Sequence, residues 1–483
     1  MTRARRALGL AVVALSLLAL GCATGTGTEL KGSGTQAPVD RAAAAQASGP
    51  LLALAVELEQ QLARANPGAD LAVAPLPVAV SLSQLRDGAR GTTAEELDRV
   101  LHAPADGGAD ALAAGLASLE QVLGSREGEH RAVTSRTGTV SIDLVQSLWL
   151  QKGTAVDQAW LDGLVTTWGA GVRTTDFRSD QETARKAVNR WMADATDGHI
   201  DQLAPRGSIS PTTRVLAAGA AYLKAPWVTP FADTDTRLGR FHHLDGSEST
   251  VPMMRNRELD DARFGRGEGW EAVDLPYLGR SLWMTVILPA PGRFTDVEEA
   301  LRGEGLPELL ASLEPAAVDL SLPKFGFTTD LPLTDALRAL GLTDATGPTA
   351  ADLSGISPEP LWLSSVLHQT YLAVDEQGTE ATATAPAPRR TTTTVRTPAT
   401  TSPRAAGRVP DDGAGSSGSS GSTGSTGVPA TTSTTTAASA AVGLGLAGAR
   451  PVAVVVDRPF LVLVRDRPTG APLLYGRVLS PKG

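Results

Sequence analysis

The apolar positions of this 483-residue chain change between helical and strand-like spacing, with no fixed repeat. From residue 51 onward, the apolar residues recur every three to four positions, as one face of a helix requires. These residues are Leu51, Leu52, Leu54, Ala55, Leu58 and Leu62. Residues 181–195 have a similar amphipathic spacing. Both segments are therefore predicted to be helices.

Shorter apolar runs in the second half of the chain predict β-strands. Residues 282–288 are almost wholly apolar, and residues 318–322 alternate apolar and polar side chains. Residues 451–456 and 460–464 are apolar throughout, which predicts a fully buried hairpin. Helices and strands mixed in this way predict an α+β fold in one large domain.

Residues 374–385 form a strand-like segment whose side chains after the acidic start are small. With a period of two, one face carries only small side chains: Thr379, Ala381, Ala383 and Ala385. Gly378 can adopt backbone angles closed to other residues, so it can act as a pivot. The pattern suits a segment that is a loop in one state and a sheet strand in another. An Ala/Thr-rich linker would have the same composition.

Composition and charge exclude several classes of function. The net charge of −9 argues against nucleic-acid binding, and the hydrophobic content of 42% is that of a globular protein. His242 and His243 have no second ligand pair at a useful spacing, so no metal is expected. The glycine pattern of residues 443–448 precedes Pro451 and a strand-like run rather than a helix, so no dinucleotide cofactor is expected. No catalytic constellation is visible, and the chain is not expected to be an enzyme.

The N-terminus predicts export. Three arginines precede an apolar run, residues 7–20, which is too short to span a membrane as a mature helix. Residues 1–21 are therefore predicted to be a signal peptide. Cys22 follows it directly, is the only cysteine in the chain, and resembles the acceptor of a bacterial lipoprotein. The alternative is an ordinary signal peptide with an accidental cysteine.

Lipidation would anchor the protein to a membrane, at the bacterial cell envelope or cell surface. Residues 22–47 are rich in Gly, Thr and Ala and predict a flexible tether. The folded domain is then expected over residues 48–483. Within it, residues 386–450 consist almost entirely of Thr, Ser, Gly, Pro and Ala. Such a composition buries too little apolar surface to fold, so this stretch is predicted to be disordered.

About ten short motifs occur along the chain in a familiar order. They are N-R-W at 189–191 with T-x-G-x-I at 196–200, Y-L-K-A-P-W at 222–227, V-P-M-M at 251–254, L-P-Y at 275–277, V-I-L-P at 286–289, P-K-F at 323–325, L-G-L at 340–342, A-D-L-S-G-I at 351–356, D-R-P-F at 457–460 and L-Y-G-R-V at 474–478. Their identity, order and spacing resemble those of the serpins. Each motif alone is weak, but the whole series covers nearly the entire chain.

The resemblance implies the serpin fold, a single α+β domain with a main mixed β-sheet, further sheets and a helical N-terminal half. It also implies a reactive loop over residues 376–456, which a target protease attacks as a substrate. After cleavage, the hinge half of the loop enters the main sheet as a new strand and traps the acyl-enzyme. Small side chains suit such an insertion into a packed sheet. The implied hinge residues are Glu376, Gly378, Thr379, Ala381, Ala383 and Ala385.

Further site residues follow from the resemblance. Lys224 and Trp227 match the top of the sheet, where insertion begins, and His368 matches the shutter beneath it. Counting from Glu376 places the scissile bond near Thr392 and Thr393. Arg390 and Arg396 lie close by and would instead suit a trypsin-like enzyme. The loop is also enlarged, by about 56 residues relative to ordinary serpins, far beyond usual loop lengths.

The chain departs from the family pattern at two places. Pro386 and Pro388 lack the amide hydrogen that a central strand needs, and Arg389 would point inward. Near His368, the family's S-P-x-S motif is replaced by A-P-L-P at residues 74–77, and Gly219 stands where asparagine is usual. Two hypotheses stay open: a monomeric inhibitor of a serine or cysteine endopeptidase, and a non-inhibitory serpin that serves as a surface binding, display or bait module.

Overall fold

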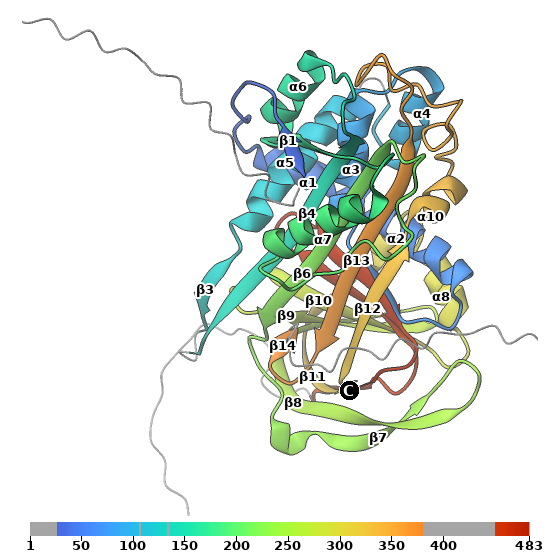
Figure 1. Cartoon of the computed structure of the whole chain (residues 1–483). Helices are drawn as coiled ribbons and strands as arrows, with labels where there is room; N and C mark the ends of the chain where they lie inside the picture. Colours follow the sequence, from blue (N-terminus) through green and yellow to red (C-terminus); the bar gives the residue numbers. More distant parts are fainter. Residues whose placement is uncertain (1–26, 106–107, 133–135, 380–449, 483) are drawn as a thin grey trace, which may run out of the picture. The chain divides into compact units, whose positions relative to one another are not determined.

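The computed structural model describes residues 27–105, 108–132, 136–379 and 450–482 (Figure 1). These residues belong to one compact unit. Its helices are α1 (Arg41–Gln46), α2 (Ser48–Ala65), α3 (Pro75–Asp87), α4 (Gly91–Val100), α5 (Gly108–Gly124), α6 (Gln158–Trp168), α7 (Gln181–Ala195), α8 (Phe294–Ala300), α9 (Gly305–Ala311) and α10 (Thr334–Ala339).

The strands of the described residues form two sheets. In chain order they are β1 (Thr28–Leu30), β2 (Leu71–Val73), β3 (Gly128–Arg131), β4 (Thr137–Gln151), β5 (Val172–Thr175), β6 (Val215–Pro226), β7 (Arg237–His242), β8 (Glu248–Gly267), β9 (Trp270–Pro276), β10 (Leu282–Pro289), β11 (Glu314–Pro323), β12 (Phe325–Pro332), β13 (Leu363–Val374), β14 (Gly378–Thr379), β15 (Val452–Val455), β16 (Phe460–Asp466) and β17 (Pro472–Val478).

The main sheet has the strand order β1-β5-β4-β6-β14-β13-β12, with β3 paired to β4. Helix α7 covers one face, where its buried residues Val188 and Trp191 join Trp149 of β4 and Leu216 of β6 in one apolar cluster. Helix α3 packs against β4 and β6 as part of the principal core. The sheet is therefore buried on both faces along its centre, as strands with continuous apolar runs require.

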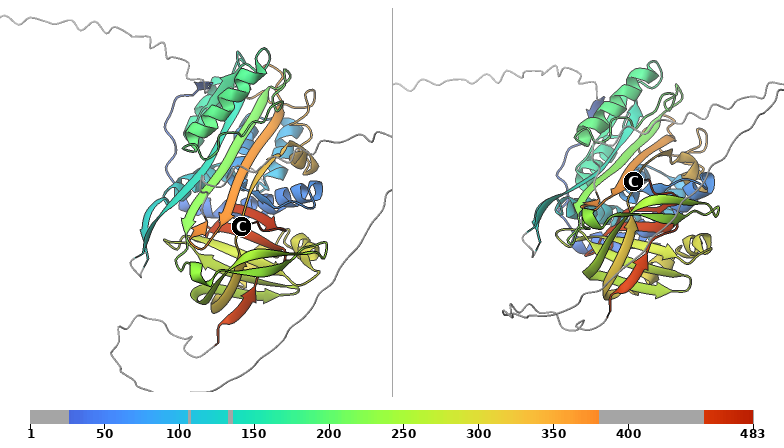
Figure 2. Two further views of the ribbon diagram at one scale, coloured as in Figure 1. Left: turned by 60° about the horizontal axis from the view of Figure 1, so that its bottom comes forward. Right: turned by 90° about the horizontal axis from the view of Figure 1, so that it is seen from below.

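The second sheet has the order β15-β11-β8-β9-β10-β16-β17-β2, with β7 paired to β8. Figures 1 and 2 show its yellow-green and red strands gathered at the end of the main sheet where β14 lies. Helix α2 packs on β17 and β2, and α8 and α9 cover β10 and β16 through a second apolar cluster. Both sheets thus share one continuous core around α2 and α3.

Several expectations are confirmed. The helix expected from residue 51 is α2, and α7 has the predicted bounds. Strands β10 and β11 contain the two predicted strand segments. The mixture of helices and sheets confirms the α+β class.

The predicted hairpin of residues 451–456 and 460–464 is wrong. Strand β15 pairs in parallel with β11, whereas β16 pairs with β10 and β17. Between the two strands, the Asp457 carbonyl accepts from the His242 amide, and Arg458 Nε donates to the Pro289 carbonyl. Residues 451–456 are not fully buried either, because Pro451, Ala453 and Val455 are exposed. The apolar run therefore identified a strand but not its partner or its degree of burial.

The tether expected over residues 22–47 is also wrong for its described part. Strand β1 pairs with β5, and α1 packs on α5. Ala44 and Ala47 are buried in the core, and the Ala37 amide donates to the Thr166 carbonyl at 2.8 Å. Small side chains, taken from composition as a sign of flexibility, here permit close packing.

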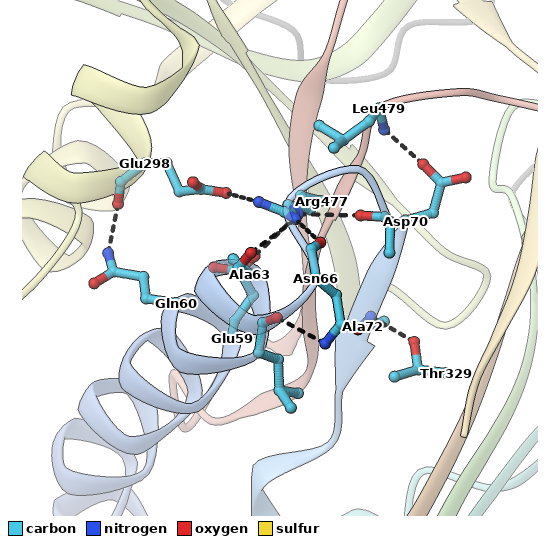
Figure 3. A network of polar contacts seen from close by, with 12 residues as sticks. Glu59, Gln60, Ala63, Asn66, Asp70, Ala72, Glu298, Thr329, Arg477 and Leu479 are labelled. Carbon is cyan, nitrogen blue, oxygen red and sulfur yellow. Dashed lines mark hydrogen bonds and ion pairs between the residues drawn. The ribbon is translucent and has the colours of Figure 1, made fainter. Parts of the chain in front are cut away.

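A buried polar network surrounds Arg477 on β17 (Figure 3). Its guanidinium donates to the carbonyls of Ala63 and Asn66 and to Glu298 Oε1, and its Nε lies 3.9 Å from Glu59 Oε1. Glu59 is fully buried, and no donor hydrogen-bonds its carboxylate oxygens. Burial and the neighbouring Glu298 carboxylate raise the pKa of Glu59 to about 8. Glu59 therefore favours its protonated form in the folded protein at neutral pH.

Candidate functional site

The candidate site begins at a tight turn, residues 375–378, that joins β13 to β14. We call this segment the hinge turn. Asp375 closes it in two ways: its amide donates to the Gly378 carbonyl at 3.0 Å, and its Oδ1 accepts from the amides of Gln377 and Gly378. Aspartate favours such turns because its short side chain can bond the backbone two residues on.

After the turn, β14 enters the main sheet between β13 and β6. Thr379 pairs with Val374 on one side and with Ala225 on the other. Gly378 is required by close approach, because a Cβ atom there would lie 2.2 Å from the Ala225 carbonyl oxygen. The first two residues of the expected inserting segment are thus already paired within the sheet.

The side chain of Thr379 points into the core, where its Oγ1 lies 2.5 Å from the Tyr277 hydroxyl. Tyr277 is fully buried and stacks on Trp227 with ring centroids 4.5 Å apart. The small-residue face of the segment therefore begins on the buried side of the sheet. Burial raises the pKa of the Tyr277 hydroxyl far above its usual value, so it stays neutral and can donate.

Trp227 holds the backbone of the hinge turn. Its indole Nε1 donates to the Asp375 carbonyl at 3.0 Å, and its amide donates to the Gln377 carbonyl at 2.8 Å. Arg136 bridges the same residues by donating to the Trp227 carbonyl and to Gln377 Oε1. These bonds satisfy the buried backbone groups of a turn that lies at the end of a sheet.

Glu376 fixes the hinge turn to two neighbouring elements. Its Oε2 lies 2.5 Å from Lys324 Nζ, and its Oε1 accepts a hydrogen bond from Thr236 at 2.6 Å. The amide of Phe231 donates to its carbonyl. Burial alone would raise the pKa of Glu376, but the bonds from Lys324 and Thr236 together hold the pKa below its usual value. The carboxylate is therefore ionised at neutral pH.

Below β14 the main sheet is closed. Residues 363–370 of β13 pair in parallel with residues 215–221 of β6 through seven residue pairs. A strand that continued from Thr379 would have to separate these pairs and replace each with two antiparallel ones. Among the described residues, β6 and β13 are therefore separated by another strand only at the hinge end, where β14 lies between them.

His368 lies in the middle of the closed part, opposite Gly219. Its Nε2 accepts the amide hydrogen of Ala74 at 3.1 Å, while its Nδ1 faces the Gly219 backbone without a well-formed hydrogen bond. Pro77 fills the space above Gly219, since a Cβ at residue 219 would lie 3.2 Å from Pro77 Cβ. Burial lowers the pKa of His368 to about 4, so the imidazole is neutral. Apolar contacts thus replace the polar partners expected from the resemblance.

Of the remaining predicted site residues, only Lys224 belongs to the described part of the chain. Lys224 lies on β6, paired with Ser141 of β4. The others lie outside the described residues: Cys22, Ala381, Ala383, Ala385, Arg390, Thr392, Thr393 and Arg396. Among the described residues, no group of three or more His, Cys, Asp and Glu side chains is arranged to hold a metal ion. In the same part of the chain, no helix is both long and apolar enough to cross a bilayer.

Sequence reasoning missed the residues that bind the hinge turn from elsewhere in the chain. Lys324 and Tyr277 each stand inside one of the motifs quoted above, and Thr236 follows the motif of residues 222–227, but the motifs carry no sign of what these residues contact. Arg136 lies in no motif. Their roles depend on segments that are more than 50 residues apart meeting at one end of the sheet.

A family model described as serpin (serine protease inhibitor) matches residues 51–404. This chain is a serpin. An uncharacterized serpin-like protein of Thermococcus kodakarensis is 30% identical over 410 residues, which cover 84% of this chain and 80% of the relative. Human Serpin B11 is 28% identical and covers 68% and 86%.

Solved serpin structures share the fold. The thermophilic serpin tengpin in its native state superposes with a TM-score of 0.68 at 20% identity, covering 93% of this serpin and 97% of tengpin. Uncleaved ovalbumin superposes with a TM-score of 0.66 at 19% identity, covering 90% and 99%. Serpins are generally protease inhibitors rather than catalysts.

Proposed function

We propose that this serpin inhibits an endopeptidase by cleavage and insertion of its reactive loop. The observation that carries the proposal is the pairing of Gly378 and Thr379 between β6 and β13. Because β14 is already paired at the hinge end, insertion can proceed one residue pair at a time. Each new pair would extend an existing hydrogen-bond ladder. Small inward side chains and a pivot glycine are what this motion requires.

The register of β14 predicts where the next residues would lie. Val374 pairs with Thr379, so each step of two along the loop moves two residues back along β13. Three buried residues of β13 would then each pair with one hinge alanine. These pairs would be Leu372 with Ala381, Thr370 with Ala383 and His368 with Ala385. All three positions demand small side chains because the core beneath them is packed.

Insertion would be favourable because it adds antiparallel pairing on both sides of the new strand. The present parallel pairing between β6 and β13 is slightly weaker per residue. Each methyl group that enters the core adds about 0.8 kcal/mol of hydrophobic stabilisation. The completed strand would therefore be more stable than the loop, as a trapping mechanism needs.

A non-inhibitory role is the second candidate function, and one observation favours it. Continued in register, Pro386 would lie beside Leu367, in the part of the sheet where every amide should be paired. Arg389 would reach the buried face two positions after Ala387. If insertion stops at Ala385, the enlarged loop would serve for binding, display or bait.

The enlarged reactive loop leaves the target open between two protease classes. Thr392 and Thr393 suit an elastase-like or subtilisin-like enzyme, whereas Arg390 and Arg396 suit a trypsin-like enzyme. Either a serine or a cysteine endopeptidase could form the acyl-enzyme. We further propose that the protein is exported, that Cys22 carries a lipid at the bacterial cell envelope or cell surface, and that the serpin acts there as a monomer.

Limited cleavage of the reactive loop tests the mechanism. A broad-specificity protease at low dose would nick the loop, and the melting temperature would be compared before and after. We expect a large rise, because the freed hinge would insert, and we expect SDS-stable complexes with at least one protease. An unchanged melting temperature with associated fragments would support the non-inhibitory role instead.

Thr379→Arg provides the matching variant. It places a cation on the buried face beside Tyr277, which would block insertion. Glu380→Arg is the control, because residue 380 belongs to the opposite face. Complexes that form equally well with Thr379→Arg and with the unchanged serpin would contradict loop insertion.

A further inference from the structure

The described N-terminal residues, 27–47, lie along one end of the main sheet; we call them the N-terminal strap. Strand β1 adds to the edge of the sheet by pairing with β5. Beyond it, the amide and hydroxyl of Ser33 donate to Asp162 Oδ1 on α6 at 2.7 and 3.0 Å. The Asp40 amide then donates to Ser118 on α5. The strap is thus bonded along its length to β5, α6 and α5.

Glycines allow the strap to lie this close. A Cβ at Gly32 would be 2.3 Å from the Leu161 carbonyl carbon, and a Cβ at Gly171 would be 2.3 Å from the Leu30 carbonyl oxygen. Both distances are far inside van der Waals contact, so no larger residue fits. The strap is therefore part of the folded domain from Gly27 onward.

The strap and the hinge turn lie at opposite ends of the main sheet. Arg173 of β5 pairs with Trp149, which pairs with Leu216 near the start of β6. The hinge residue Thr379 pairs with Ala225 near the end of the same strand. A strand of this length separates the two ends by about 30 Å. Figure 1 shows the same arrangement, with β1 at the top and β14 at the bottom.

Only a short stretch of chain separates Cys22 from the strap. Five peptide units join Cys22 to Gly27, and a fully extended chain covers at most about 3.6 Å per residue. Gly27 therefore lies within about 18 Å of whatever holds Cys22. A flexible tether up to residue 47 would have allowed a reach several times longer.

We infer that the strap end of this serpin, where β1 meets β5 and α6, faces the phospholipid bilayer, and that the hinge end faces the aqueous phase. The inference rests on the proposed acylation of Cys22. It presents the reactive loop away from the membrane, where a soluble protease can reach it.

The short connection, rather than charge, sets this orientation. The exposed charged residues of the strap balance one another: Glu29, Lys31, Asp40 and Arg41. An evenly charged surface gains little from anionic headgroups. The orientation should therefore change little with salt, unlike that of a basic membrane-binding patch.

Energy transfer to a labelled bilayer tests the inference. Acylation of Cys22 leaves no free thiol in the chain, so an introduced cysteine is a unique attachment point. A donor dye would be placed at exposed Thr35 on the strap or at exposed Glu258 on β8 near the hinge end, as Thr35→Cys or Glu258→Cys. The lipidated full chain would be reconstituted into phosphatidylethanolamine–phosphatidylglycerol vesicles that carry an acceptor lipid.

We expect transfer from residue 35 to exceed transfer from residue 258 by about twofold or more, given the separation of the two ends. An insertion of about twenty Gly and Ser residues after Ala23 should remove most of this difference, because a long flexible linker no longer restrains the domain. Gly32→Val, which displaces the strap, should reduce the difference as well.

Equal transfer from both positions in the acylated protein would overturn the orientation alone. Mass spectrometry of the N-terminal peptide shows whether Cys22 is acylated, and so distinguishes a wrong orientation from a missing lipid anchor. An unmodified Cys22 would overturn the proposed lipidation and this inference together. The Cys22→Ser variant, which cannot be acylated, should leave the vesicles entirely.

Discussion

Lys324 Nζ lies 2.5 Å from Glu376 Oε2, and this ion pair joins the residue before β12 to the hinge turn. The carboxylate side chain is only 6% exposed, whereas the lysine side chain is 31% exposed. The pair is thus asymmetric: water can solvate the cation but not the anion. Loss of the lysine and loss of the glutamate should therefore destabilise the hinge turn by different amounts.

Lys324→Met should release the hinge turn more than Glu376→Gln does. The first leaves a buried carboxylate with Thr236 as its only side-chain partner, at a cost of about 2–3 kcal/mol. The second removes the buried charge and keeps a hydrogen-bonding side chain, for about 1 kcal/mol. Hydrogen exchange of the peptide that contains Gly378 and Thr379 would report both.

Lys186→Met is the control for this pair, since Lys186 makes an exposed 3.8 Å ion pair with Glu182 on α7. Its effect on hinge exchange should be negligible. Equal exchange in Lys324→Met and the unchanged protein would mean that the ion pair does not hold the hinge.

Gly378→Ala should expel β14 from the sheet. The added methyl would lie 2.2 Å from the Ala225 carbonyl oxygen, a backbone atom that cannot move aside. We expect faster exchange at Thr379 and earlier proteolysis of the hinge. Gly68→Ala, where a Cβ meets no atom within 4 Å, should change neither. Retained protection at Thr379 would show that the turn adapts without glycine.

Gly219→Asn should destabilise the closed sheet by about 1–3 kcal/mol, as overpacking does. Pro77 occupies the space that the new side chain needs. The double variant Gly219→Asn with Pro77→Ser should recover part of the loss, because it opens that space and adds a partner for the amide. Thermal melting of the two single variants and the double variant measures the coupling. Additive effects would mean that the two residues do not compete for space.

Glu59→Gln should stabilise the protein in alkaline solution. The folded-state pKa of Glu59, about 8, lies above its unfolded value. Stability from the protonated form is therefore fully present below about pH 4.5 and is lost as the pH rises through 8. Glutamine cannot ionise, so the variant should gain about 1–3 kcal/mol over the unchanged protein at pH 9 and little at pH 5.

Urea unfolding at pH 5 and at pH 9 measures this difference. Glu57→Gln is the control on the same helix, because the hydrogen bond and charge of His102, with Arg302, lower the pKa of Glu57 despite partial burial. It should give no alkaline gain. A Glu59→Gln variant that loses stability equally at both pH values would mean that Arg477 needs the ionised Glu59.

Local signals in the sequence predicted much of the fold. The bounds of α7 and the strands β10 and β11 follow from periodicity, because burial of one helix face or of a strand leaves a regular pattern. Small side chains on one face suit a strand in a packed sheet, and Thr379, the first of the small set after Gly378, is buried there between β13 and β6. These properties belong to consecutive residues, so they can be read along the chain.

Only the tertiary structure decided which distant residues meet. The pairing of β15 with β11, the contact of Lys324 with Glu376 and the bond of Ser33 to Asp162 each join segments separated by more than 50 residues. No local pattern encodes such a partner, because the same apolar run or charge could be buried against many surfaces. The strap is the clearest case: Gly and Ala read locally as flexibility, whereas in the folded protein their small size lets the chain lie against β5, α6 and α5.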